Sequence, residues 1–149
     1  MIDEAEIRTL IPHAGAMCLL QRVDDWNASS IACSTTTHRD AKNPLRSNGR
    51  LSAIHLIEYG AQACAIHGGL LSRAAGEKSA KPGMLTALRD CKIHVEHVGD
   101  IDTTLTITAR KLIASGGGSM YQFEVRAGER ALVEGRVSVT TLTALPSSG

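Results

Sequence analysis

Leu51-Ser-Ala-Ile-His-Leu-Ile-Glu-Tyr-Gly-Ala-Gln-Ala-Cys-Ala-Ile-His-Gly-Gly-Leu-Leu71 is apolar on almost every side when it is wound as a helix. A helix of that kind belongs in the interior of a domain. It nevertheless carries Glu58 and Gln62 one turn apart, and we expect Glu58 to be buried. A carboxyl group in a dry core is costly unless it has partners or a chemical task. Glu58 is therefore the first candidate for a functional residue.

The segments around this helix carry mostly strand and turn patterns. A short helix is predicted over 4–10, and a long polar loop over 38–50 leads to Ser52, a residue type that favours the N-cap. Strands are predicted over 17–23 and over 30–37, which is rich in Ser and Thr. From 84 onward, period-two alternation predicts further strands in part of 84–98, 103–113, 121–126 and 131–139. Turns are predicted at 24–27, 115–119 and 127–130.

This order of elements predicts the fold class. One flat sheet cannot cover a helix that is apolar all round, whereas a strongly curved antiparallel sheet can wrap around it. The sequence therefore predicts an α+β domain over 1–149, with a curved antiparallel sheet of about six strands around one long central helix. The last residues, 145–149, are expected to be a frayed tail.

Composition limits the classes of function. The chain has 149 residues, enough for one domain with a real core, and 43% of them are hydrophobic. Aromatic residues make up only 3%, so the core must be aliphatic. A net charge of +1 argues against a strong electrostatic hold on nucleic acid or on a membrane.

Cysteine usage and the first residues indicate a reducing compartment. Cys18, Cys33, Cys64 and Cys91 form no CxxC pair, so we expect free thiols, no metal and no cofactor. The acidic start over 1–6 is unlike a signal peptide. The central helix has about the length of a membrane span, but charged and polar residues interrupt it. We expect a soluble cytoplasmic protein.

Two motifs connect the chain to a known family. Ile11-Pro-His-Ala-Gly-Ala-Met-Cys-Leu-Leu-Gln-Arg-Val23 fits the pattern L-P-H-x-x-P-F-L-L-x-D-R-V, with alanine and glutamine replacing the second proline and the aspartate. Glu58-Tyr-Gly-Ala-Gln-Ala63 fits E-A-x-A-Q-A. Both patterns resemble the hot-dog fold 3-hydroxyacyl-acyl carrier protein dehydratases of the FabZ type. Asn43-Pro-Leu-Arg-Ser-Asn-Gly-Arg-Leu51, followed by Ile57-Glu-Tyr59, is similar to their divergent ApeP-like subgroup, which belongs to aryl-polyene and related fatty-acid-like gene clusters.

The resemblance implies an activity and exposes a gap. In this family a loop histidine, in a G-H-F-P-G motif, and the helical glutamate form a catalytic pair across a dimer interface. The glutamate corresponds to Glu58, whereas the histidine position falls on Pro44, beside Asn43. The implied partners are an acyl carrier protein or an acyl-CoA thioester, and a homodimeric or heterodimeric hot-dog partner.

Dehydration of a 3-hydroxyacyl thioester needs an acid, a base and donors for the thioester carbonyl. Glu58 suits the acid, because burial would raise its pKa. The N–H of Ala53 or Ile54 at the helix start could face the carbonyl. Gln62 could orient the carboxyl group or bind the leaving water. Asn43 and Tyr59 are expected at the substrate, with packing as the alternative for Tyr59.

The base is open among three histidines. His13 is the first candidate, because its loop carries half of the motif match. The alternative is that His13 only holds that loop in place through hydrogen bonds. His55 lies one turn before Glu58, and His38 lies on the long loop. His67 is expected in the core or an interface. His94 and His97 are expected to be structural, because residues three apart on a strand face opposite sides.

Three functions therefore compete. The first is a dehydratase whose acyl chain runs along the central helix, with basic loop residues (Arg39, Lys42, Arg46 and Arg50) either facing an acidic carrier or simply solvated. The second is a non-catalytic subunit that completes a heterodimer with an active dehydratase. The third is an acyl thioesterase, because the fold alone does not decide the reaction.

Overall fold

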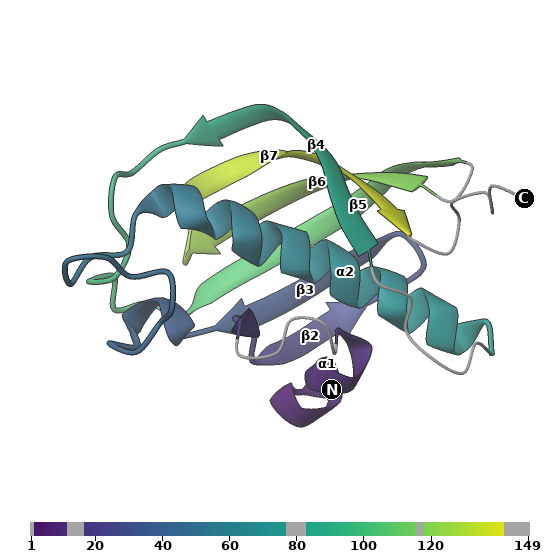
Figure 1. Ribbon diagram of the computed structural model, residues 1–149, viewed down its shortest axis with the longest axis horizontal. Coiled ribbons are helices and arrows are strands. Elements are labelled where there is room, and N and C mark those ends of the chain that lie inside the picture. Colours follow the sequence, from purple (N-terminus) through teal and green to yellow (C-terminus); the bar gives the residue numbers. More distant parts are fainter. Residues whose placement is uncertain (1, 12–16, 77–82, 116–117, 142–149) are drawn as a thin grey trace, which may run out of the picture.

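A long helix, α2 (Leu56–Ala74), lies along the concave side of one strongly curved antiparallel sheet (Figure 1). In this computed structural model the structure describes residues 2–11, 17–76, 83–115 and 118–141. The sheet has seven strands in the order β1-β2-β3-β5-β6-β7-β4. The strands are β1 (Ile2–Asp3), β2 (Arg22–Trp26), β3 (Ser30–Thr35), β4 (Gly83–Ile93), β5 (Leu105–Ser115), β6 (Gly118–Ala127) and β7 (Arg130–Thr141).

This architecture confirms the predicted hot-dog arrangement of one central helix and a wrapping sheet. The number of strands differs slightly, because Ile2–Asp3 adds a short strand that pairs with Arg22 and Val23. The predicted helix over 4–10 is α1 (Glu4–Leu10), and the Asp3 carboxylate accepts a hydrogen bond from the Glu6 N–H at 3.0 Å. The predicted turn at 127–130 is the β6–β7 hairpin, where Gly128 has a φ of 61°.

The central helix begins later than its apolar pattern suggests. Leu51 and Ser52 are extended and lie against the β4–β5 connection, where Val98 N–H donates to the Leu51 carbonyl at 3.0 Å. A short 3₁₀ turn, η3 (Ala53–His55), then leads into α2. Ser52 occupies the N-cap position of η3, but its hydroxyl makes no capping hydrogen bond, so the predicted cap is wrong.

The predicted strand over 17–23 and the predicted turn over 24–27 are both wrong in position. The strand runs instead from Arg22 to Trp26, with a bulge between Val23 and Asp25. The backbone of Met17 and Leu19 bonds to side chains rather than to a neighbouring strand. A run of apolar residues therefore marks burial here without marking a β-ladder.

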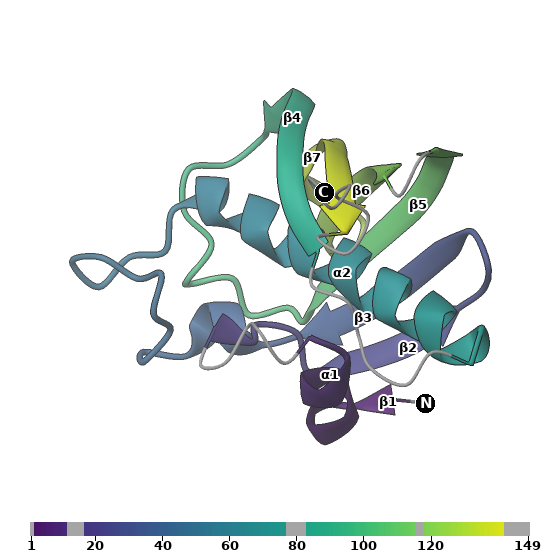
Figure 2. The ribbon, with the colours of Figure 1, turned by 45° about the vertical axis from the view of Figure 1, so that its right-hand side comes forward.

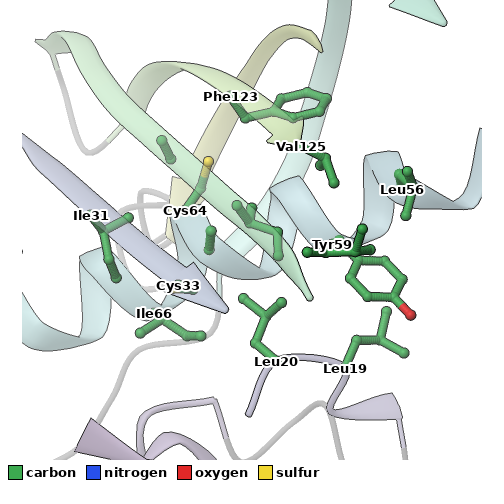
Figure 3. Close-up of a cluster of buried hydrophobic side chains, with 14 of the residues drawn as sticks. Leu19, Leu20, Ile31, Cys33, Leu56, Tyr59, Cys64, Ile66, Phe123 and Val125 are labelled. Atoms are coloured by element: carbon green, nitrogen blue, oxygen red, sulfur yellow. The ribbon is translucent and has the colours of Figure 1, made fainter. Parts of the chain in front are cut away.

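The core lies between α2 and the concave face of the sheet (Figure 3). Phe123 from β6 packs directly on Gly60, where an added Cβ would lie 2.6 Å from the Phe123 Cγ. Tyr59 lies beside Leu19, with its hydroxyl pointing away from the cluster. Apart from Tyr59, Tyr121 and Phe123, the buried core side chains are aliphatic or cysteine, as the composition predicts.

Two further predictions concern the chain outside this core. No helix among the residues that the structure describes is long and apolar enough to cross a membrane. The predicted tail at 145–149 lies outside the described residues, as does part of the predicted turn at 115–119. The polar loop that enters η3 protrudes beyond the N-terminal end of α2, beside the β4–β5 connection (Figure 2).

Candidate functional site

Glu58 lies in the first turn of α2 and is exposed, so the expectation that this chain buries it is wrong. The helix buries one side against the sheet and turns the other side outward. The outward side carries small residues, Ala61, Ala65 and Gly68, which are only partly buried. Small apolar residues made the helix look apolar all round, although one face is open. Among the described residues, none forms a hydrogen bond or ion pair with the Glu58 carboxylate.

The sheet has an open edge. β4 is the last strand of the sheet, so one of its edges has no partner strand within the described chain. The large apolar residues exposed near this edge and at the helix start are Ile54 (54% exposed), Leu88 (41%) and Ile93 (44%). Leu88 and Ile93 pair with Val137 and Val133, whose side chains are buried on the concave side. Exposed apolar groups beside an unpaired strand are typical of an interface.

Asn43 and Tyr59 tie the long loop to the helix. The Asn43 Nδ2 donates to the Tyr59 hydroxyl and to the Thr37 carbonyl, both at 2.9 Å. Its Oδ1 accepts from the Leu45 N–H at 2.9 Å. Both residues are buried, and burial raises the pKa of Tyr59. The structure therefore shows a packing role for both residues, and contact with substrate stays a prediction.

Gln62 uses both ends of its amide to hold the segment that begins at Met17. Its Oε1 accepts from the Leu19 N–H at 2.8 Å, and its Nε2 donates to the Met17 carbonyl. Gln62 is buried, whereas Glu58, one turn earlier, is exposed. The amide therefore positions the chain that follows His13. A role in orienting the Glu58 carboxyl group or binding water would require Gln62 to give up these bonds.

Only one of the two predicted N–H donors at the helix start is available. The Ala53 N–H donates to the Glu96 carbonyl at 2.8 Å, so the expectation that it is free is wrong. The Ile54 N–H has no hydrogen-bond acceptor among the residues described. Because the helix dipole is positive at this end, Ile54 remains a suitable donor to a developing negative charge.

The candidate bases differ sharply in their surroundings. His13 lies outside the described residues. His38 is fully buried, and its Nε2 lies 2.9 Å from the Ile101 carbonyl; burial lowers its pKa. His55 is partly buried, and neither ring nitrogen has a partner in the described part of the chain. No hydrogen bond joins it to Glu58, one turn away, within those residues.

His67 is a core residue, as predicted in one of the two readings. Its Nε2 donates to the Asn27 carbonyl at 2.8 Å, and its Nδ1 therefore accepts from the Tyr121 hydroxyl at 2.6 Å. The ring is fully buried, and burial lowers its pKa. A neutral imidazole with both nitrogens occupied is not available as a base.

The basic residues of the long loop separate into two kinds. The Arg46 guanidinium donates to the carbonyls of Asp40 (2.8 Å), Gly49 (3.0 Å), His38 (2.9 Å) and Gly99 (3.2 Å). Arg39 pairs with Asp102 at 3.6 Å. Lys42 and Arg50 have no side-chain partner among the described residues. Arg46 thus stabilises the loop, whereas the side chains of Lys42 and Arg50 remain free to contact a partner.

Arg50 and His55 also line a hollow at the start of α2, together with His97, which was expected to be structural. Sequence reasoning missed this grouping, because His97 lies far from the others in the chain. An isolated bridge between Ser52 and His97 brings them together. The hollow can therefore be recognised only when this long-range pairing is known.

Comparison with known proteins bears on the family. Residues 5–147 match the family model described as ApeP-like, ApeP dehydratase. A chain of the dehydratase heterocomplex ApeI:P from Xenorhabdus doucetiae is similar in structure, with a TM-score of 0.82 and 24% identity over 95% of this chain and 91% of that one. A search of curated proteins finds no match.

More distant structures share the fold alone. A hypothetical thioesterase from Streptococcus pneumoniae, solved with coenzyme A, has a TM-score of 0.61 and 11% identity over 81% of this chain and 87% of that one. A protein from Thermus thermophilus has a TM-score of 0.60 and 17% identity over 88% and 97%. Identities this low support the architecture and not a shared reaction.

Proposed function

Because the chain belongs to the ApeP-like dehydratase family, we propose that it forms one half of a composite dehydratase, in which Glu58 meets the histidine of a second hot-dog subunit. The proposed substrate is a 3-hydroxyacyl thioester on an acyl carrier protein, and the product is the trans-2-enoyl thioester. The pathway would be a fatty-acid-like or aryl-polyene-type biosynthesis.

The observation that carries this proposal is the exposure of Glu58. Proton transfer from a carboxyl group to a departing hydroxyl group needs a site from which bulk water is excluded, so an acid role for Glu58 needs a covering surface. The free edge of β4 and the exposed side chains of Ile54, Leu88 and Ile93 offer that surface a place to bind. A second subunit there would cover Glu58.

The missing loop histidine supports a different subunit as the partner. Asn43, next to the position where the family carries its histidine, is buried and bonded to Tyr59 and Thr37. A homodimer would therefore lack this histidine at both of its sites. The similar ApeP-containing structure is described as a dehydratase heterocomplex, which also supports pairing with a different hot-dog subunit.

The proposed reaction divides the chemistry between the two subunits. The partner histidine removes a proton from C2, which the thioester carbonyl makes acidic, while the Ile54 N–H can donate to that carbonyl. The C2–H electron pair forms the C2=C3 bond, and the C3–O bond breaks. Glu58 gives its proton to the departing hydroxyl group, which leaves as water.

The test is activity of the copurified heterocomplex with Glu58→Gln. We expect the turnover of 3-hydroxyacyl-carrier protein to fall by about 10²-fold or more, the usual contribution of a general acid. The matched control is Glu129→Gln, because Glu129 is exposed in the β6–β7 hairpin and its carboxylate has no partner in the described chain. That control should retain full activity. Full activity of the Glu58→Gln complex would reject the role of Glu58 and leave the chain as a non-catalytic subunit.

The same variants separate chemistry from assembly. The Glu58 carboxylate forms no hydrogen bond or ion pair in the described chain, so the free energy of unfolding of Glu58→Gln should lie within about 0.5 kcal/mol of the wild-type value. Copurification with the partner should also persist. An active, homogeneous homodimer of this chain would contradict the proposed division of the site.

A further inference from the structure

The convex face of the sheet, on the side away from α2, carries two neighbouring rows of opposite charge (Figure 1). In the acidic row, Glu124 of β6 lies directly opposite Glu134 of β7. In the basic row, two residues further along β7, Arg136 lies directly opposite Arg89 of β4. The residues that flank Glu134 and Arg136 on β7 are buried on the concave side, so these charged side chains point away from α2.

The basic row has no partner within the described chain. Arg89 and Arg136 are exposed, and neither forms a hydrogen bond or an ion pair with a described residue. Like charges directly opposite on neighbouring strands repel each other and destabilise the ladder. Arg110 of β5 extends the same row beyond Gln122, and it is exposed and unpaired in the described part of the chain as well. Three guanidinium groups in one row therefore favour a partner that supplies carboxylates.

The acidic row limits what that partner can be. Each of its carboxylates has one side-chain partner in the described chain, His94 at 3.3 Å from Glu134 and Arg126 at 3.0 Å from Glu124, and keeps unused acceptor sites. The two rows are only about 7 Å apart along the strand. A nucleic acid or an anionic membrane on the arginines would therefore also meet these carboxylates and be repelled. The face fits a surface that itself carries both charges in adjacent rows.

The relief of the convex face allows a second sheet to approach. A hollow of about 380 Å³ lies beside the two rows, and its lining includes the small outward side chains of Ser30, Ala32 and Thr108. Sheets that pack face to face lie about 10 Å apart, which an arginine and a glutamate from opposite sheets can span. A flat and polar sheet face of this kind can pack against a copy of itself.

We propose that the convex face binds a second copy of this chain back to back, about a two-fold axis that runs across the strands between Glu134 and Arg136 of β7. Rotation about this axis keeps the order of the strands and reverses their direction. It places Glu134 of each copy opposite Arg136 of the other. Because a two-fold interface uses the same patch twice, this one match gives two ion pairs.

The proposed contact is centred on β6 and β7 and leaves the edge of β4 uncovered. β4 carries basic residues in both rows, with Lys92 opposite Glu134 and Arg89 opposite Arg136, so this axis gives β4 no acidic partner. The inference does not depend on the proposed function, because the convex face lies on the far side of the sheet from α2 and Glu58. The same contact would join two heterocomplexes back to back.

Sedimentation velocity of the full-length chain over a range of concentrations measures the association. We expect a dimer that weakens as the salt concentration rises, because ion pairs near the surface are screened by salt. A wild-type chain that stays monomeric at all concentrations would overturn the proposal. Variants of the convex face then separate this contact from association through the edge of β4.

Two charge reversals test the match between the rows. Glu134→Arg makes both outward positions of β7 basic, and Arg136→Glu makes both acidic. Each variant alone should associate at least about 10²-fold more weakly than the wild type, because like charges then meet across the axis. An equimolar mixture of the two variants should associate again, because each acidic group then meets an arginine. Unchanged association of the single variants, or a mixture that stays monomeric, would overturn the proposal.

Milder variants cover a reversal that fails to fold, which circular dichroism detects. Glu134→Gln and Arg136→Gln each remove one charge without adding the opposite one, and each should weaken the association by about tenfold. Wild-type affinity in both of these variants would contradict the proposed contact.

Glu129→Arg is the matched control for Glu134→Arg. It makes the same change of charge at an exposed residue of the β6–β7 turn, and it should associate as the wild type does. An equal loss in both variants would show an effect of net charge and would overturn the proposal. In the copurified heterocomplex, Glu134→Arg should halve the mass of the assembly, and an unchanged mass would contradict the back-to-back contact there. This readout does not require dehydratase activity, so failure of the proposed reaction and failure of the interface are distinguishable.

Discussion

The Asn43 amide donates a hydrogen bond to the Tyr59 hydroxyl at 2.9 Å, which joins the long loop to the central helix one residue after Glu58. The same nitrogen donates to the Thr37 carbonyl at 2.9 Å. Since the Tyr59 hydroxyl accepts from Asn43, its own proton is available to Thr37 Oγ1 at 3.0 Å. A closed network of hydrogen bonds therefore fixes the long loop against α2.

Asn43→Ala should therefore lower the free energy of unfolding by about 2–3 kcal/mol. The change removes three hydrogen bonds and leaves the Thr37 carbonyl and the Tyr59 hydroxyl with one partner fewer in a buried place. Urea unfolding of the isolated chain, followed by circular dichroism, measures the loss.

A double-mutant cycle with Tyr59→Phe tests the link between the two side chains. Tyr59→Phe alone should cost about 1–2 kcal/mol, because only the hydroxyl is lost. The double variant should lose less than the sum of the single losses, because both changes break the same bond. Strict additivity would mean that Asn43 and Tyr59 stabilise the loop independently.

The fold could be predicted from the sequence because burial leaves a local pattern. Leu105, Ile107 and Ala109 alternate along β5, and all three are buried, as their spacing indicates. The site could not be predicted in the same way. Gln62 binds backbone groups of Met17 and Leu19, and such pairings across many residues leave no periodic signal.

The exposure of Glu58 was missed for a related reason. Alanine and glycine on the outward face of α2 count as apolar in a helical pattern, although they need no burial themselves. Ala61, Ala65 and Gly68 therefore suggested a fully covered helix, whereas the chain alone leaves this face partly open. A helix face that a second subunit buries and a face that the same chain buries show the same pattern of apolar residues in the sequence.

Gln62→Leu should destabilise the chain by about 2–4 kcal/mol. Leucine has a similar volume but cannot satisfy the Leu19 N–H or the Met17 carbonyl, and each unsatisfied buried group costs about 1–3 kcal/mol. Amide hydrogen exchange should report faster opening at Leu19 than in the wild type. A variant with wild-type stability and exchange would show that Gln62 does not hold this segment.

Gln62→Glu separates the two bonds by their dependence on pH. An ionised carboxylate can accept from the Leu19 N–H but cannot donate to the Met17 carbonyl, whereas the protonated form can do both. Folding should therefore favour the protonated form, and the variant should lose stability as pH rises above about 4.3, the ordinary pKa of glutamate. Chemical unfolding at pH 4, 5.5 and 7 measures this trend, which the wild type should not share.

The buried histidines should make the wild-type chain less stable in mild acid. Burial lowers the pKa of His67 and of His38 below the ordinary value of 6.5. Below pH 6.5 the unfolded chain then binds more protons than the folded chain. The free energy of unfolding therefore falls as the pH decreases below 6.5, and it regains its full value at higher pH. Each histidine can contribute at most about 1.4 kcal/mol per pH unit.

Unfolding between pH 5 and 7 should detect this slope before most carboxylates are protonated. His67→Gln removes one titrating ring, so its stability should depend less steeply on pH than that of the wild type. The imidazole resonances of His67 in the folded chain should titrate below pH 6.5. Titration at or above that value would contradict the account of a buried neutral ring.

Two glycines of α2 should respond in opposite ways to the same substitution. A Cβ at Gly60 would lie 2.6 Å from the Phe123 Cγ, whereas a Cβ at Gly68 meets no atom within 4 Å. Gly60→Ala should therefore lower the free energy of unfolding by about 1–3 kcal/mol through overpacking. Gly68→Ala should raise it by about 0.5–1 kcal/mol, because alanine loses less backbone entropy in a helix.

Thermal unfolding of the isolated chain measures both changes. Phe123→Leu should itself be destabilising, because it removes part of a fully buried ring. In a Gly60→Ala background it should cost less than it does alone, since the smaller side chain gives the new methyl group space. Additive losses would mean that the ring already moves away from the helix without cost. A loss of stability in Gly68→Ala would mean that the outward face of α2 is already covered, as it would be in a self-associated chain.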